Sequence, residues 1–311
     1  MEKDFHYDII YSIARLTECD NPEIIAHASQ FVDDNNERWL GDDIPFPEKI
    51  PYPTGGHYFP IMTQSMSVLS VDPYIQKFVY IPFHFLPGDD AALTIGGMTN
   101  TLSTTPNSSN AQFLLNNALA SMNPYKVGIA LHTFADTWSH QNFTGMQEDW
   151  NVVDTHNLKK YVIPAIGHAH AVHHPDVISE TWTDLRLDAD NRQIVNADRA
   201  LDAIEKIYTA MRRITGNGPD WATAKPRYEG IVQASDFNSR TEAVARLVAD
   251  ECNNEAVHAY DKDAWVGAVL QRSGLSIEFK PGVTLKNTDW YQFNQAAKEQ
   301  LSIVLGLIKD L

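Results

Sequence analysis

The stretch NPYKVGIALHTFADTWSHQNF is the part of the chain that most restricts how it can fold. Asn123 and Pro124 suit the start of a helix, because the Asn side chain can cap free backbone N–H groups and Pro has no N–H to leave unsatisfied. Large apolar residues then point to every side of the predicted helix, namely Ile129, Leu131, Phe134 and Trp138. A helix that is apolar all round must be covered by other elements. We therefore predict a central, buried helix that continues to His140.

Three polar residues interrupt this apolar helix at intervals of four, namely His132, Asp136 and His140. Residues four apart share one face of a helix, so these side chains form a stripe. Burying two imidazoles and a carboxylate without partners would be costly. A hydrogen-bonded core network is one solution. Metal binding is the interpretation we favour, because His and Asp donors at this spacing suit Zn²⁺ or a similar divalent ion.

The remaining sequence favours an all-α fold, a multi-helix bundle with long irregular loops and the metal site between helices. The prolines and glycines between residues 40 and 60 predict a loop, and Pro82 and Pro87 predict an extended or irregular segment around His84. No internal repeat or low-complexity linker is visible. We expect one helical domain over residues 1–311, with the metal site in 1–185 and a helical scaffold in 186–311. Further helices are predicted at about 8–16, 22–34, 110 onward, 197–214, 239–255 and 290–311.

The overall charge limits the partners that this chain can bind. Its formal net charge is −16 at pH 7, and no cluster of Lys and Arg appears that would attract nucleic acid or an anionic membrane. The start of the chain does not resemble a signal peptide, and no apolar run approaches the roughly 18 residues of a membrane span. We therefore expect a cytoplasmic protein without integral membrane contact. The only two cysteines, Cys19 and Cys252, form no CxxC pair, so His and carboxylate ligands are expected.

The N-terminal part of the chain supplies several candidate ligands. If the first residues are extended, Asp4 and His6 point to the same side. One of Asp33 and Asp34 is a second candidate, and the other is interpreted as a carboxylate at the end of its helix. His84 lies between two phenylalanines, and ligand and buried-core interpretations both remain open for it, of which we favour the ligand.

The segment IGHAHAVHHPD contains a further set of imidazoles. We choose His168, which follows a glycine that lets the backbone approach a site, and Asp176, which follows a proline. Three other histidines in the segment are equally available by type: His170, His173 and His174. Eleven of the twelve histidines occur at or before position 174. His57 is interpreted as a loop residue, and His156 and His258 are interpreted as surface or packing residues.

Several of these strings together resemble a known family. DFHYDIIYSIARL, EIIAHASQFVDD, PFHFLPG, ALHTFADTWSHQNF and IGHAHAVHHPD resemble microbial proteins classed as a domain of unknown function, over about the first 180 residues. More distantly, the His-x3-Asp pattern followed by another His resembles the zinc-dependent phospholipase C and P1 nuclease superfamily, which cleaves phosphate esters with three zinc ions.

The distant resemblance implies roles for individual residues. It makes Asp136 a ligand that bridges two ions beside His132, adds His6 and one of Asp33 or Asp34 to the same cluster, and gives His140 and His168 to a neighbouring ion. In that superfamily the mature amino terminus is itself a ligand, and Asp4 is expected to replace it here. The longer spacing between the His140 region and the next His cluster leaves two or three zinc ions open.

The leading functional prediction is metal-dependent hydrolysis of a phosphate ester, with a phospholipid headgroup or small phosphodiester as substrate. Metal ions lower the pKa of a bound water and stabilise charge on phosphoryl oxygens, and Asp34 is the predicted catalytic base. A metal-stabilised structural or interaction module without catalysis is the alternative. The adjacent His-Asp pair of HD-type phosphohydrolases, the G-x-S-x-G elbow and the P-loop are all absent.

Overall fold

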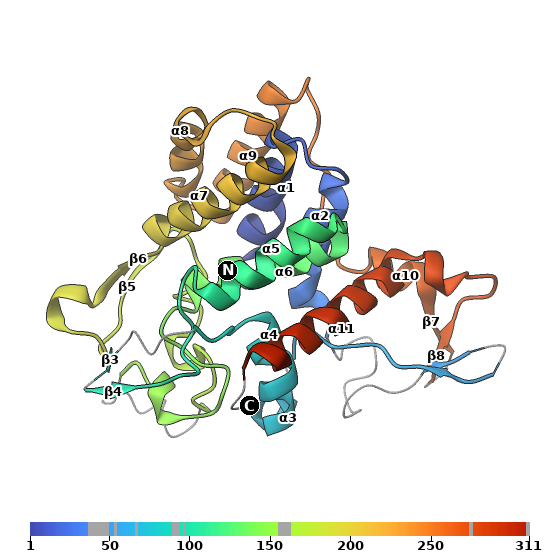
Figure 1. Ribbon diagram of the computed structural model, residues 1–311, viewed down its shortest axis with the longest axis horizontal. Helices are drawn as coiled ribbons and strands as arrows, with labels where there is room; N and C mark the ends of the chain where they lie inside the picture. Colours follow the sequence, from blue (N-terminus) through green and yellow to red (C-terminus); the bar gives the residue numbers. More distant parts are fainter. Residues whose placement is uncertain are drawn as a thin grey trace.

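The computed structural model describes residues 1–36, 50–52, 55–65, 68–88, 94–95, 97–154, 163–273 and 276–308. Helices dominate this part of the chain (Figure 1). The α-helices are α1 (Ile10–Leu16), α2 (Pro22–Asp34), α3 (Pro73–Ile75), α4 (Ile81–Phe83), α5 (Ser109–Ser121), α6 (Pro124–Ser139), α7 (Asn196–Thr215), α8 (Trp221–Val232), α9 (Phe237–Glu251), α10 (Ala264–Val269) and α11 (Asp289–Leu307). The all-α prediction is confirmed.

Short elements connect these helices. Two π-helical segments, η1 (Asp4–Ile9) and η4 (Gln76–Tyr80), precede α1 and α4. The 3-10 turns are η3 (Val68–Val71), η5 (Asp149–Asn151), η7 (Ala169–Ala171), η8 (Ala189–Asn191) and η9 (Leu285–Asn287). The strands form antiparallel pairs: β1 (Ile50–Pro51) with β2 (His57–Tyr58), β3 (Thr94–Ile95) with β4 (Met98–Thr99), β5 (Thr181–Thr183) with β6 (Gln193–Val195), and β7 (Leu270–Ser273) with β8 (Ser276–Phe279).

Helix α6 is the central, buried helix that the sequence predicts. The Asn123 side chain accepts hydrogen bonds from the backbone N–H groups of Tyr125 (3.0 Å) and Lys126 (3.2 Å), which caps the first turn. Every residue from Val127 to Ser139 is buried. Helices α2, α5, α7 and α11 pack around it. The helix ends at Ser139, so His140 lies at its C-terminal cap, one position beyond the last helical residue.

A glycine brings α2 close to α6. A Cβ atom on Gly128 would lie 2.4 Å from the Ile25 carbonyl oxygen and 2.6 Å from the Ala28 Cβ, both on α2. These separations are too short for non-bonded atoms, so a larger residue at this position would push the helices apart. The close contact places Asp33, near the C-terminal end of α2, beside the buried face of α6.

The structure corrects two local predictions. Residues 4–6 are not extended but belong to the π-helix η1, in which positions two apart point in different directions. The segment before His84 is also not extended, because η4 and α4 run on to Phe83. Pro82 is accommodated at the start of α4, where a missing N–H and a fixed φ are tolerated. Irregular structure begins only at His84.

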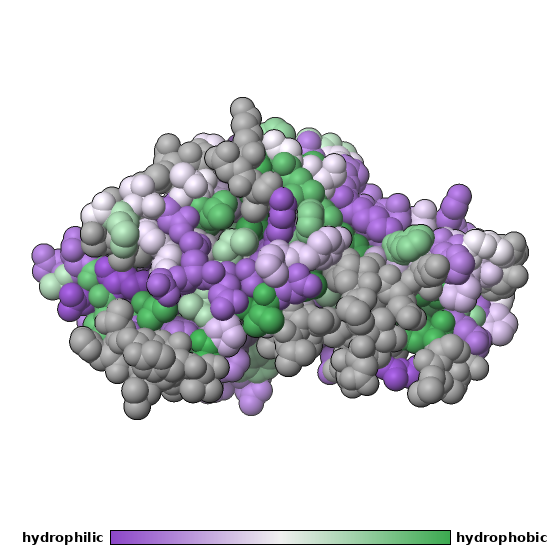
Figure 2. Space-filling view, turned by 90° about the horizontal axis from the view of Figure 1, so that it is seen from below, coloured by the Kyte–Doolittle hydropathy of each residue, from purple (hydrophilic) through white to green (hydrophobic). Residues whose placement is uncertain are grey.

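The second half of the chain contains the predicted helices with small shifts at their ends. The structure has α7, α9 and α11 where the sequence predicts helices at 197–214, 239–255 and 290–311, although residues 309–311 lie outside the described part. Helices α8 and α10 and the strand pairs were not predicted. Within the described residues, no helix has the length and apolar character needed to cross a membrane. Figure 2 shows hydrophilic and hydrophobic residues interspersed over the coloured part of one face.

Candidate metal centre

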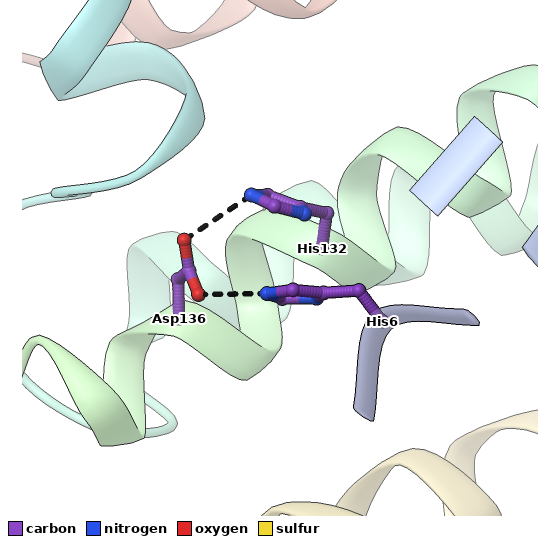
Figure 3. A group of neighbouring side chains, drawn as sticks. All are labelled: His6, His132 and Asp136. Carbon is purple, nitrogen blue, oxygen red and sulfur yellow. Dashed lines mark hydrogen bonds and ion pairs between the residues drawn. The ribbon is translucent and has the colours of Figure 1, made fainter. Parts of the chain in front are cut away.

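Asp136 is the point at which the candidate ligands meet. Its Oδ1 lies 3.1 Å from Nε2 of His6, and its Oδ2 lies 3.2 Å from both Nδ1 of His84 and Nε2 of His132. These four side chains come from η1, the end of α4 and two turns of α6, and all are buried. Figure 3 shows the His6 and His132 rings side by side, each directed at one carboxylate oxygen, and their centroids are 3.9 Å apart.

Within the described residues, three groups of side chains bring nitrogen and oxygen donors close enough to share an ion. Within each group, one donor atom from every residue lies within 4.8 Å of the others. In the second group, Oδ1 of Asp33 lies 3.8 Å from both Nδ1 of His84 and Nε2 of His132. The groups are His6–His132–Asp136, Asp33–His84–His132 and His140–His168–Asp176. The first two groups share His132, so they are two neighbouring candidate ion positions.

The third group is built around Asp176. Its Oδ1 lies 3.2 Å from Nε2 of His140, and its Oδ2 lies 3.2 Å from Nε2 of His168. Nδ1 of His140 is also 3.6 Å from Oδ2 of Asp136, which connects this group to the other two. Phe85 stacks on the His140 ring with centroids 4.4 Å apart. This stacking depends on Gly167, because a Cβ there would lie 2.4 Å from the Phe85 ring.

Backbone carbonyls orient three of these histidines. His84 donates from Nε2 to the Thr63 carbonyl (2.8 Å), and His140 donates from Nδ1 to the His84 carbonyl (2.7 Å). His168 donates from Nδ1 to the Val172 carbonyl (2.8 Å). A carbonyl oxygen can only accept, so in each neutral ring the opposite nitrogen presents a lone pair. All three of these nitrogens face carboxylates, so either a proton on the ring or a metal ion must lie between nitrogen and oxygen.

The amino group of Met1 also lies at the centre. It is 2.7 Å from Oδ1 of Asp136 and 3.3 Å from Oδ1 of Asp176, so it bridges the first and third groups. Burial lowers the pKa of this amino group, but the surrounding carboxylates outweigh burial and raise it to about 11. The positive charge between buried Asp136 and partly buried Asp176 indicates that the centre favours cations. The expectation that Asp4 would replace an amino-terminal ligand is wrong, because η1 packs with the Met1 amino group beside Asp136 and with Asp4 beside Arg240.

The protonation of the histidines depends on where each ring lies. Burial lowers the pKa of His6 to about 3 and that of His132 to about 4, and it also lowers the pKa of His168. Burial acts on His140 in the same direction, but the carboxylates of Asp136 and Asp176 reverse the effect and raise its pKa. His6 and His132 are thus neutral near pH 7, the form in which imidazole binds a metal.

The carboxylates of the centre respond in two ways. Burial would raise the pKa of Asp136, yet neighbouring His140 and the Met1 amino group hold it well below its usual value. The pKa of Asp176 is lowered in the same manner, chiefly by His168. Asp33 behaves differently, because burial outweighs its nearby histidines and raises its pKa. The two lowered carboxylates are therefore ionised and can act as ligands.

Two predicted ligands belong to none of the three groups. Asp4 forms a fully buried ion pair with Arg240 on α9. Asp34 accepts hydrogen bonds at Oδ2 from the Tyr260 hydroxyl (2.9 Å) and the Gln30 amide (3.2 Å). The other eight predicted ligands are members of the groups, namely His6, Asp33, His84, His132, Asp136, His140, His168 and Asp176.

The other histidines that the sequence left open lie elsewhere. His170 donates from Nε2 to the Ile163 carbonyl (2.8 Å). His174 pairs with Glu180, whereas His173 is exposed and lines the cavity described below. His57 and His258 are exposed, and His156 lies outside the described residues.

A cavity of about 1060 Å³ opens onto the centre. Met1, Asp33, His84, Asp136, His140, His168 and Asp176 all line it, and so does Asp34. Apolar residues line the same cavity, among them Ile163, Pro164, Ile166, Val172 and Phe237. A molecule in this cavity could therefore contact both the donor groups and apolar side chains.

The fold and the donor groups together define a helical protein with a buried cluster of His and Asp residues that could hold metal ions. The chain belongs to a family of unknown function, DUF6765, whose model matches residues 1–308. The match extends well beyond the first 180 residues that carried the sequence resemblance. No curated protein and no solved structure matches the chain, so the resemblance to the phospholipase C and P1 nuclease superfamily has no support from these comparisons.

Proposed function

We propose that the protein is a metal-dependent hydrolase that acts on a phosphate ester. The observation that carries this proposal is the orientation of His84, His140 and His168, whose outer N–H groups donate to backbone carbonyls. Metal-binding histidines usually make such a bond, which fixes the tautomer and aims the free nitrogen at the ion. Hydrogen bonds among neutral rings and carboxylates alone would leave lone pairs facing each other.

The donor set favours Zn²⁺, because imidazole nitrogens and carboxylate oxygens are its common ligands outside cysteine sites. Three groups give room for up to three ions, and the sharing of His132 by two groups permits two ions instead. His6 belongs only to the first group, Asp33 only to the second and Asp176 only to the third, so replacing each in turn would identify which group holds an ion. Ions at these positions would lower the pKa of bound water and supply positive charge to a phosphoryl group.

Asp34 is the proposed catalytic base. It lines the cavity but belongs to none of the three donor groups. Its Oδ2 is held by Tyr260, so the carboxylate has a fixed position from which to orient or deprotonate a water beside Asp33. Burial and the Asp34 charge raise the pKa of Tyr260, so the phenol remains a hydrogen-bond donor.

The cavity favours a small phosphodiester or a phospholipid headgroup over nucleic acid. Among the described residues that line it, Lys3 is the only Lys or Arg, and that side chain pairs with Asp8. An anionic substrate would consequently depend on the metal ions for its attraction. A long polyanion would instead meet the many carboxylates of a chain with a net charge of −16.

A structural role for the metal is the second candidate. It is favoured by the burial of His6 and His132, which do not line the cavity, since a closed site leaves no position for substrate. All three members of the third group line the cavity, and His168 and Asp176 are partly exposed. The two roles can therefore coexist in one centre.

Elemental analysis combined with turnover of a bis-aryl phosphodiester, before and after chelation, tests these proposals. Two or more zinc ions per chain with chelator-sensitive turnover support the hydrolase, and Asp34→Asn should then lower kcat while zinc content is unchanged. Bound zinc without turnover on a broad phosphoester panel supports the structural role. Absence of stoichiometric metal from both the wild type and His132→Ala would refute both.

A further inference from the structure

A buried ion pair holds the N-terminal segment against α9. Arg240 donates from Nε to Oδ2 of Asp4, and its Nη1 donates to the Ala234 carbonyl (3.1 Å). Arg240 is 1% exposed and Asp4 is 0% exposed, so water does not solvate either charge. Isolating such charges from water is costly unless the geometry of the pair is well satisfied. A pair of apolar residues would fill the same space without that cost, so the charges need another explanation.

Two more contacts join the same surfaces. Lys3 lies 2.9 Å from Oδ2 of Asp8, and Thr241 donates to that oxygen at 2.8 Å. The Lys3 ammonium also lies 5.0 Å from the centre of the Phe237 ring in the first turn of α9. Lys3, Asp4 and Asp8 therefore all face α9. Asp4 contacts Arg240, and Asp8 contacts the adjacent residue Thr241.

The opposite side of the same short helix carries the metal donor. His6 lies two positions from Asp4 in η1, so its ring points away from α9 and toward α6. The amino group of Met1 lies on the α6 side as well, next to Asp136. Any rotation of η1 about its axis would withdraw His6 from Asp136. A directional ion pair resists such rotation in a way that apolar contacts do not.

We propose that Arg240 is a positioning residue of the metal centre, which acts through Asp4 to fix the rotation of η1 and so to aim His6 at the ion beside Asp136. This inference rests on the proposed metal centre and adds to it a residue from the distant C-terminal part of the chain. It also explains why Asp4, with the chemistry of a ligand, is occupied elsewhere.

The test replaces both charges together, because removing one alone leaves the other buried and unpaired. In Asp4→Leu/Arg240→Met, Co²⁺ and Zn²⁺ titrations are followed by visible absorption and elemental analysis, with helix content checked by circular dichroism. The ion held by His6 should bind about 10- to 100-fold more weakly, as for other residues that orient a ligand. The ions of the other groups should be retained. Val248→Ala, a buried change two turns further along α9, is the matched control and should bind the wild-type number of ions.

Arg240→Lys gives a second measurement if the double variant does not fold. It keeps the charge but cannot donate from Nε, so weaker binding at the same ion is expected with the fold intact. Unchanged affinity for every ion in a folded double variant, or in Arg240→Lys, would overturn the positioning role. A wild-type protein that binds no metal would instead refute the proposed function, so the two failures can be told apart.

Discussion

Replacing Gly128 by alanine should separate α2 from α6 and weaken one metal group selectively. The new Cβ would lie 2.4 Å from the Ile25 carbonyl oxygen, and ordinary contact begins near 3.4 Å, so α2 must move by about 1 Å. Overpacking of this kind costs about 1–3 kcal/mol, and the upper end applies because the opposing atom is backbone. Alanine is the better helix former by about 1 kcal/mol, which leaves a net loss of about 2 kcal/mol in the free energy of unfolding.

The same displacement should reach the metal centre. Asp33 is the member of the three groups that lies on α2, and its Oδ1 already lies 3.8 Å from both Nδ1 of His84 and Nε2 of His132. A shift of about 1 Å is large against a Zn–ligand bond of about 2.0–2.2 Å, so the ion of this group should be lost first. The groups that contain His6 and Asp176 should keep their ions.

Urea unfolding and zinc titration of Gly128→Ala measure the two effects. Gly230→Ala on α8 is the matched control, because a Cβ there meets nothing within 4 Å. This control should gain about 1 kcal/mol from helix propensity and retain every ion. If Gly128→Ala is as stable as Gly230→Ala and binds as much zinc, the close packing of α2 on α6 does not position the centre as we argue.

Three further predictions follow from the structure. Burial against Tyr260 and Trp265 lowers the pKa of His27 from 6.5 to about 4. Between these pH values the unfolded chain binds a proton that the folded chain does not, so the free energy of unfolding falls as the pH falls. In urea unfolding, His27→Phe should therefore remove about 2 kcal/mol of the difference in stability between pH 7 and pH 5. Asp136→Asn should lose at least one ion per chain by elemental analysis, and full zinc content would contradict its central position. Removal of zinc by a chelator should lower the Tm measured by differential scanning fluorimetry. If free zinc was 100 times its Kd before chelation, the loss of stability is about 2.7 kcal/mol. An unchanged Tm would show that no ion was removed from the folded state.

The central helix could be predicted because all of its signals are local. Asn123 and Pro124 mark its start, and the apolar residues on every side require burial whatever surrounds them. The spacing of His132, Asp136 and His140 likewise follows from helix geometry alone. These residues also set the fold class, since a buried helix with polar groups needs several neighbours to supply partners.

The N-terminal segment could not be predicted in the same way. DFHYDI is short, and its mixture of polar and aromatic residues is compatible with an extended or a helical backbone. In the folded chain this segment is held by tertiary contacts, among them the pair of Asp4 with Arg240, more than two hundred residues away. The position of the Met1 amino group depends on that tertiary contact and has no local signal. Similarly, composition does not distinguish His168 from His170, because their backbone partners, Val172 and Ile163, are set by how the whole loop folds.

The backbone carbonyls that hold His84, His140 and His168 have a consequence for how variation at this centre should be interpreted. A carbonyl is present at every position whatever the side chain, so the residues at 63 and 172 can change type while the same acceptor stays in place. A comparison of related chains by side-chain identity would therefore overlook half of what orients the donors. Turn geometry around these positions, rather than the identity of their residues, would be the feature to compare among relatives.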